Sequence, residues 1–278
     1  MRIGFALPNH WGVEDPEDLL DLAERAEGTG FSSVWVSHHI LNAGYVGERL
    51  GLKPYWDALT LLSWVAARTE RVRLGTSVLV LPYLHPMALA KQLATIDVMS
   101  GGRLDVGVGV GSMPEENEAL GIDYHTRGAV ADECIDVMKA LWADGAASYA
   151  GTHYSFRDAV ASPKPLQQPN PPLLIGGNGV PALRRVARCG DGWHPYLLGP
   201  EQMEQRLPRL EEELAKAGRS RDQISVSLRV DIDTVPTRES TEVYAALGID
   251  ELVISFNSGD AEAQRRRLAA SAEALLPA

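Results

Sequence analysis

The sequence contains little cysteine, an excess of acidic over basic residues, and no long hydrophobic run. Its two cysteines, Cys134 and Cys189, are too few for a disulfide framework, and we expect buried apolar thiols in a reducing cytoplasm. The 26 Lys and Arg residues are outnumbered by 37 Asp and Glu residues, and the net charge of −11 argues against a nucleic-acid or anionic-membrane partner. The basic triplet 265–267 lies among acidic residues and is predicted to be a solvated helix face.

The apolar segments are also too short for a membrane span or a signal peptide. Residues 1–8 carry only a five-residue apolar run before Pro8, and no later run reaches the roughly 18 residues of a membrane span. The hydrophobic fraction of 45% is ordinary for a globular protein with a sizeable core. These features predict a soluble, cytoplasmic protein.

Apolar runs of strand length alternate with helical patterns along the whole chain. Eight runs predict strands, at residues 3–7, 33–37, 72–80, 104–109, 173–176, 192–196, 224–230 and 251–255. Eight helical patterns follow them, the first beginning at Pro16 and the others covering 57–69, 86–99, 128–143, 181–189, 200–217, 239–247 and 260–276. This order favours a (β/α)8 TIM barrel over an open doubly wound sheet. We expect one domain over residues 1–278, with a small hairpin and loop insertion around 144–172.

Two adjacent histidines, His38 and His39, follow the second predicted strand, at the barrel end where active sites lie. Their chemistry suits a general acid or base or a contact with a cofactor ring, because imidazole titrates near neutral pH. A purely structural pair is the alternative. A metal site is disfavoured, and none is predicted, because neighbouring residues of a strand point to opposite faces.

Two glycine-rich segments follow later strands. Residues 107–111 lack the spacing of a dinucleotide fingerprint, so their glycines permit either close packing or the approach of a ligand to bare backbone. Residues 176–179 precede Pro181, at the start of a helix that contains Arg184 and Arg185. A glycine-rich turn that enters a helix is an anion site in many barrels, although a simple tight turn is the alternative. These residues predict a barrel enzyme with a phosphate-bearing ligand and leave the reaction open.

Several segments together resemble the luciferase-like monooxygenase superfamily, and within it the oxidoreductases that depend on the deazaflavin coenzyme F420. The strongest are residues 69–82, 85–92, 100–109, 163–165 and 175–193. The resemblance covers nearly the whole chain and implies a bacterial-luciferase-like barrel. It also implies hydride transfer between F420 and a small organic substrate, and a homodimer.

The resemblance assigns roles to individual positions. It implies a cis peptide bond between Ser77 and Val78 behind the cofactor ring, and it makes His39 the acid/base group. His38 stands where many relatives have an aspartate, which puts the protonation chemistry in question. The remaining cofactor contacts implied are His38 itself and the glycine-rich positions Gly109, Gly111, Gly176, Gly177 and Asn178. Five further residues are expected to form a substrate wall, with packing at the rim as the equal alternative for each: His10, Trp11, Trp56, His85 and His194.

Other hypotheses remain open at this point. Some sugar-phosphate-oxidising relatives have a glutamate soon after the fourth strand, but Glu115 and Glu116 lie beyond Pro114, and neither receives that role. An FMN-dependent monooxygenase on the same fold is the first alternative, and a flavin-binding barrel without turnover is the second. A metal-dependent barrel hydrolase is a distant third. The expected partner is a small-molecule substrate.

Overall fold

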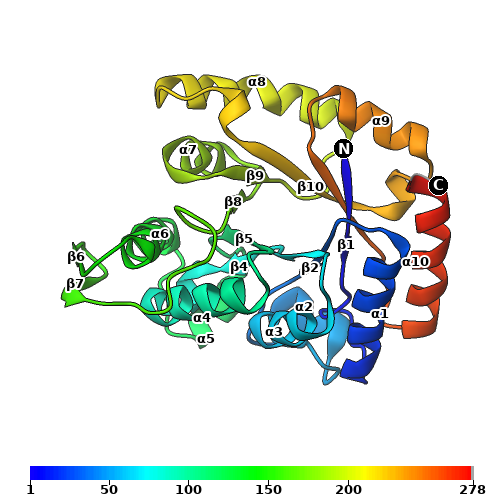
Figure 1. The fold of residues 1–278 in the computed structure, drawn as a ribbon, viewed down its shortest axis with the longest axis horizontal. Coiled ribbons are helices and arrows are strands. Elements are labelled where there is room, and N and C mark those ends of the chain that lie inside the picture. Colours follow the sequence, from blue (N-terminus) through cyan, green and yellow to red (C-terminus); the bar gives the residue numbers. More distant parts are fainter. Residues whose placement is uncertain (277–278) are drawn as a thin grey trace.

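The protein is a closed barrel of eight parallel strands surrounded by helices, as seen in a computed structural model that describes residues 1–276 (Figure 1). The barrel strands are β1 (Arg2–Ala6), β2 (Ser33–Val36), β3 (Arg73–Thr76) continued by β4 (Leu79–Val80), β5 (Leu104–Gly109), β8 (Leu173–Gly176), β9 (Gly192–His194), β10 (Ser225–Asp231) and β11 (Glu251–Ser255). Each strand pairs in parallel with the next, and β1 pairs with β11 to close the ring. The predicted TIM barrel is confirmed.

The helices follow the strands as the periodicity predicts. The eight main helices are α1 (Pro16–Thr29), α3 (Ala58–Arg68), α4 (Pro86–Met99), α6 (Arg127–Trp142), α7 (Val180–Cys189), α8 (Pro200–Lys216), α9 (Arg238–Ala246) and α10 (Ala261–Leu275). Two short helices, α2 (Gly44–Leu50) and α5 (Pro114–Ala119), and three single-turn 3-10 segments were not expected. Segments of one or two turns are too short for hydrophobic periodicity to reveal. Across residues 1–276, no helix has the length and apolarity needed to cross a bilayer.

The third predicted strand, at 72–80, is interrupted in the structure. It divides into β3 and β4 at the Ser77–Val78 peptide bond, which is cis, as the resemblance implies. Both halves pair with β5, through Leu74 and Gly75 on one side of the break and Leu79 and Val80 on the other. The two halves therefore act as a single member of the barrel.

The first and last helices lie side by side and join the two ends of the chain (Figure 1). Helix α1 begins at a capping Asp15, whose carboxylate accepts a hydrogen bond from the Glu17 amide, and it ends at Gly30 with φ 94°. Arg265 of α10 donates to Asp21 of α1 at 2.6 Å. The expectation of a purely solvated basic face at 265–267 is therefore wrong for Arg265, which is a partly buried link between helices.

An antiparallel hairpin projects from the barrel beside α6 (Figure 1). Its strands are β6 (Ala147–Ala150) and β7 (Ser155–Ala159), and they precede the proline-rich loop that leads to β8. Glu133 of α6 anchors the turn, because its carboxylate accepts backbone hydrogen bonds from residues 152–154. The predicted insertion at 144–172 is confirmed, and it lies away from the strand ends that form the site.

Candidate active site

The carboxyl ends of the barrel strands surround a cavity of about 340 Å³. This is the end of a TIM barrel at which active sites are built. The cavity is lined by His10, Trp11, Ser37, His38, His39, Tyr45, Val46, Arg49, Tyr55, Ser77, Val78, Val80, Gly109, Val110, Gly111, Ser112, Gly176, Gly177, His194, Tyr196 and Arg229. The lining includes each predicted catalytic and cofactor-binding residue except one, together with His10, Trp11 and His194 of the predicted substrate wall.

Three predicted residues lie elsewhere. The side-chain amide of Asn178 donates to the carbonyl of Tyr196 at 2.8 Å and accepts from its amide at 3.0 Å, so it positions a lining residue instead of lining the cavity. The Trp56 indole donates to the Val13 carbonyl at 2.8 Å. His85 is exposed at the start of α4. For these three positions, proximity to a strand end did not bring the side chain into the site.

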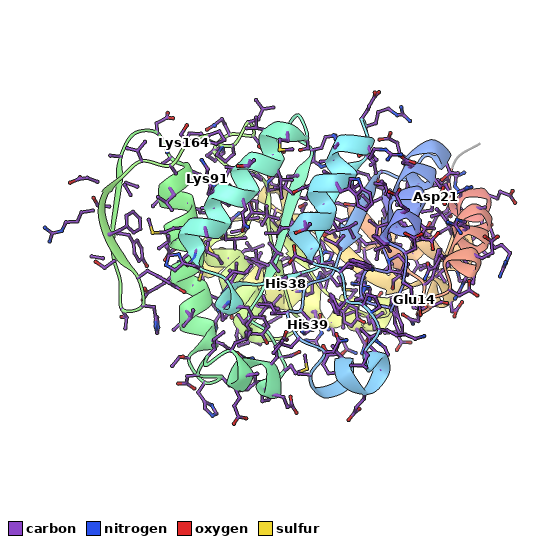
Figure 2. The ribbon with its side chains drawn as sticks, turned by 90° about the horizontal axis from the view of Figure 1, so that it is seen from below. Glu14, Asp21, His38, His39, Lys91 and Lys164 are labelled. Carbon is purple, nitrogen blue, oxygen red and sulfur yellow. The ribbon has the colours of Figure 1, made fainter. Side chains whose placement is uncertain are left out.

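The two histidines after β2 both face the cavity, and Figure 2 shows them next to each other near the middle of the molecule. We expected the side chains of these adjacent residues to point to opposite faces of a strand, and this expectation is wrong for His38 and His39. Strand β2 ends at Val36, and His38 and His39 belong to the following loop, where the alternation of a strand no longer applies. The cavity wall therefore receives two imidazoles from consecutive residues.

His39 is held by a buried carboxylate. Its Nδ1 atom lies 2.5 Å from Oε2 of Glu116, which is fully buried, and its Nε2 atom lies 3.3 Å from the Tyr45 hydroxyl. The other carboxylate oxygen of Glu116 accepts hydrogen bonds from the amides of Ile40 at 2.6 Å and Leu41 at 3.0 Å. Burial alone would raise the pKa of Glu116, but the hydrogen bonds from His39 and these amides outweigh it and lower that pKa. Glu116 is therefore an ionised partner of His39.

The contact between Glu116 and His39 was not expected from the sequence, which assigned no site role to the two glutamates after Pro114. The unexpected helix α5 turns Glu116 toward the loop after β2 and leaves Glu115 exposed. The carboxylate that contacts His39 is 77 residues away in sequence. An acidic residue soon after the fourth strand was the only local signal of this contact.

The other imidazoles of the cavity are neutral. Burial lowers the pKa of His38 to about 4, and its Nδ1 accepts a hydrogen bond from the Val80 amide at 3.3 Å. Burial and the Arg229 charge lower the pKa of His194 to about 3. Burial likewise holds the pKa of His10 well below its usual range. Neutral rings at these positions can contact a ligand without adding charge.

We predict that acidification destabilises the protein through these histidines. Their folded pKa values lie below the usual 6.5, so the unfolded chain binds protons first, and stability falls as the pH drops from about 6.5 toward 4. The loss is at most about 1.4 kcal/mol per pH unit for each histidine. Urea unfolding at pH 7 and pH 5 measures it. The loss of unfolding free energy between pH 7 and pH 5 should be smaller in His38→Asn than in the wild type. In the exposed control His125→Gln it should equal that of the wild type. A loss in His38→Asn as large as that of the wild type would contradict the prediction.

Two arginines expected near the glycine-rich turn are engaged elsewhere. Arg185 pairs with Asp132 of α6 at 2.7 Å, and Arg184 lies 3.6 Å from Glu213 of α8. Neither lines the cavity. The arginines that do line it, Arg49 and Arg229, were not predicted, although Arg229 stands out in the sequence as a charge between the apolar residues Leu228 and Val230 of a strand.

Three tyrosines of the lining received no site role from the sequence. Tyr45 lies on α2, Tyr55 on the loop before α3, and Tyr196 just beyond β9. Burial raises the pKa of Tyr45 and Tyr55, so both phenols are protonated at neutral pH. Among residues 1–276, no group of three or more His, Cys, Asp or Glu side chains is arranged to hold a metal ion.

Comparisons with known proteins give a consistent result. The model of the luciferase-like monooxygenase family matches residues 1–275. The F420-dependent glucose-6-phosphate dehydrogenase of Microbacterium testaceum is 35% identical over 244 residues, which cover 84% of this chain and 70% of that protein. The oxygenase component of the flavin-dependent trigonelline monooxygenase of Acinetobacter baylyi is 30% identical over 69% of this chain and 52% of its own. The solved coenzyme F420-dependent tetrahydromethanopterin reductase of Methanopyrus kandleri has the same fold, with a TM-score of 0.81 and 17% identity over 99% and 98% of the two chains.

Proposed function

This chain belongs to the luciferase-like monooxygenase family, and from that premise we propose that it is an oxidoreductase that transfers a hydride between coenzyme F420 and a small organic substrate. The observation that carries the proposal is the His39–Glu116 pair on the wall of a cavity with bare glycine backbone. Such a pair suits proton transfer beside a redox cofactor. The cavity volume of about 340 Å³ lies within the roughly 300–1,000 Å³ of small-ligand sites.

The glycines of the cavity fit a flat ring with a phosphate tail. A Cβ atom at Gly109 would lie 2.6 Å from a methyl group of Val78, and one at Gly176 would lie 2.8 Å from the other. Gly177 has φ +114°, which disfavours any side chain at that position. These positions therefore expose backbone to the cavity, and the Gly176–Gly177 turn precedes helix α7, a favourable place for a phosphate.

Each predicted site residue of the lining then has a role in the proposed reaction. Ser77 and Val78 would lie behind the ring, Gly109 and Gly111 along it, and Gly176 and Gly177 at the phosphate. The neutral His38 would contact the ring without competing for a proton. His39 would exchange a proton with the substrate while Glu116 holds its ring in place. When bound, the deazaflavin supplies the hydride chemistry.

Titration of the purified protein with F420 and with FMN tests the choice of cofactor. We expect F420 to bind at least ten times more tightly than FMN, with binding followed by cofactor fluorescence. The similarity to a flavin-dependent monooxygenase makes FMN the second candidate. Tight FMN binding without F420 binding would overturn the proposal in favour of an FMN-dependent enzyme.

We predict that Glu116→Gln lowers kcat about 100-fold, because loss of the carboxylate frees the His39 ring from its reactive orientation. The glutamine can still accept the hydrogen bonds from the Ile40 and Leu41 amides, so the fold and the F420 affinity should remain. Steady-state kinetics and F420 titration measure the two quantities. Glu115→Gln, an exposed neighbour, is the matched control. Unchanged kcat in Glu116→Gln, or an equal loss in the control, would contradict the positioning role.

Three wider features are also part of the proposal. A homodimer is expected from the family resemblance, and light scattering coupled to gel filtration measures the mass in solution. A cytoplasmic location is proposed because both cysteines are free thiols, Cys134 buried and Cys189 partly buried. Residues 1–278 are proposed to act as one domain, since α10 packs against α1 and joins the two ends of the barrel.

A further inference from the structure

A buried arginine on the cavity wall is not bonded to any acidic side chain of residues 1–276. Arg229 lies on β10, near the end of the strand, and only 4% of its surface is exposed. Charged side chains at this depth are normally paired with an opposite charge. Within residues 1–276, no carboxylate forms a salt bridge or hydrogen bond with Arg229. Asp231, two residues further along the strand, acts on this charge without contacting it, so the guanidinium has no direct ionic partner in the protein alone.

The hydrogen bonds of Arg229 go to neutral groups. Nη1 donates to the Ser37 hydroxyl at 2.7 Å and lies 3.4 Å from the Ser77 carbonyl, while Nη2 lies 3.0 Å from Nε2 of His10. The low pKa of His10 keeps that imidazole neutral, so it serves as an acceptor. The Nε atom is buried without a partner among residues 1–276. These contacts orient the guanidinium and leave part of its donor capacity unused.

The charge of the cavity lining is opposite to that of the whole protein. The chain carries a net charge of −11, yet none of the described lining residues is Asp or Glu, whereas Arg49 and Arg229 both line the cavity. Glu116 lies behind His39 and is bonded to it. Arg49 is exposed and stacks over Trp11 at 4.3 Å, so its charge is screened by solvent. The deep positive charge of the cavity is therefore that of Arg229.

We propose that Arg229 binds an oxyanion carried into the cavity by a ligand, and that the substrate is an organic acid, a carboxylate or a phosphate ester. The substrate class rests on the proposed function, whereas the anion site itself does not. A guanidinium binds both kinds of oxyanion through parallel hydrogen bonds, and a dry site strengthens them. The cost of burying the unpaired charge is repaid only when that anion is bound.

The oxyanion has two sources that the experiment must separate, the substrate and the coenzyme. Arg229 contacts Ser77, next to the position proposed for the coenzyme ring, so an acidic group of the ring is one source. The coenzyme phosphate already has a proposed place at Gly176 and Gly177, which favours the substrate as the source. Both sources use the same chemistry at Arg229.

Binding of simple probes to the protein without coenzyme tests the site. Calorimetric titrations at constant ionic strength compare benzoate and phenyl phosphate with benzamide, a neutral molecule of similar shape to benzoate. For the wild type we expect at least one anion to bind ten times or more tightly than benzamide. In Arg229→Gln, that anion should bind about 30-fold or more weakly, while Arg229→Lys should recover part of the loss.

The controls separate the outcomes. Arg209→Gln removes a surface arginine paired with Glu212 and should leave anion binding unchanged. F420 titration of each variant identifies the source: an unchanged F420 affinity in Arg229→Gln assigns the oxyanion to the substrate, and a tenfold loss assigns it to the coenzyme. Anion binding by a wild type that does not bind F420 would refute the proposed function alone. Two results would overturn the anion site. One is equal binding of benzamide and the anions by the wild type, which can be measured even if Arg229→Gln does not fold. The other is unchanged anion binding in Arg229→Gln.

Discussion

The His39→Ala variant is expected to lower kcat by about 10²- to 10⁴-fold while it keeps the affinity of the wild type for F420. His39 is the imidazole of the cavity that is bonded to a carboxylate, since Nδ1 lies 2.5 Å from Glu116. The imidazoles of His10, His38 and His194 are buried and held neutral by lowered pKa values. Proton exchange with a substrate therefore depends on His39. Steady-state kinetics with F420, together with fluorescence titration of the cofactor, measures the two effects separately.

A matched control for this variant is His85→Ala, at an exposed histidine at the start of α4 that does not line the cavity. We expect its kcat to match that of the wild type. Full turnover by His39→Ala would contradict the acid/base role of His39. Loss of both turnover and F420 binding would indicate instead that His39 is part of the binding surface. Binding without turnover in the wild type itself would favour a flavin-binding barrel that is not an enzyme.

The Gly107→Ala variant is expected to lose more than about 4 kcal/mol of folding stability and to fail to accumulate as folded protein. A Cβ atom at position 107 would lie 1.9 Å from the backbone carbonyl oxygen of Thr76 on the neighbouring strand β3. The Thr76 hydroxyl also donates to the Gly107 carbonyl at 2.7 Å, so the two strands cannot separate without losing that bond. The positions of the added methyl group and of the Thr76 carbonyl oxygen are both set by the backbone of the barrel strands. Rotation of a side chain therefore cannot relieve the overlap. Soluble yield and urea unfolding measure the effect.

Gly28→Ala provides the matched control, because the same methyl group is added at an exposed position of α1 that has no other atom within 4 Å of it. This change should raise stability by about 0.5–1 kcal/mol, since alanine restricts the unfolded chain more than glycine does. A stable, folded Gly107→Ala would show that the contact between Thr76 and Gly107 can relax.

These two glycines show how far local sequence can be interpreted. The pattern at 107–111 left close packing and ligand approach equally open. In the structure, Gly107 packs against Thr76, whereas Gly109 both packs against Val78 and lines the cavity. The distinction depends on which neighbouring strand approaches at each position. A run of alternating glycines cannot specify that neighbour.

The candidate site also contains residues that the sequence predicted and residues that it did not. The positions of His38, His39, Gly176 and Gly177 at strand ends followed from the order of strands and helices. The partners of His39 and the place of Arg229 did not, because Glu116 lies on a six-residue helix and Ser37 lies 192 residues from Arg229. At Asn178 the prediction failed in the opposite way. The residue lies in the glycine-rich turn as expected, but its side-chain amide bonds to the backbone of Tyr196 and does not line the cavity.

The order of apolar and helical segments was enough to predict the barrel, the approximate limits of its main helices and strands, and the end at which the candidate site lies. Helical periodicity, continuous apolar strands and capping residues are local properties that each segment carries with it. Which charges meet depends on the folded barrel: Glu116 contacts His39, Arg185 pairs with Asp132, and Arg229 is bonded to no carboxylate of residues 1–276. The reason is that closure of the barrel brings loops from distant parts of the chain to one rim. Whether a charge is paired or left for a ligand depends on distances across that rim, which no single segment of sequence contains.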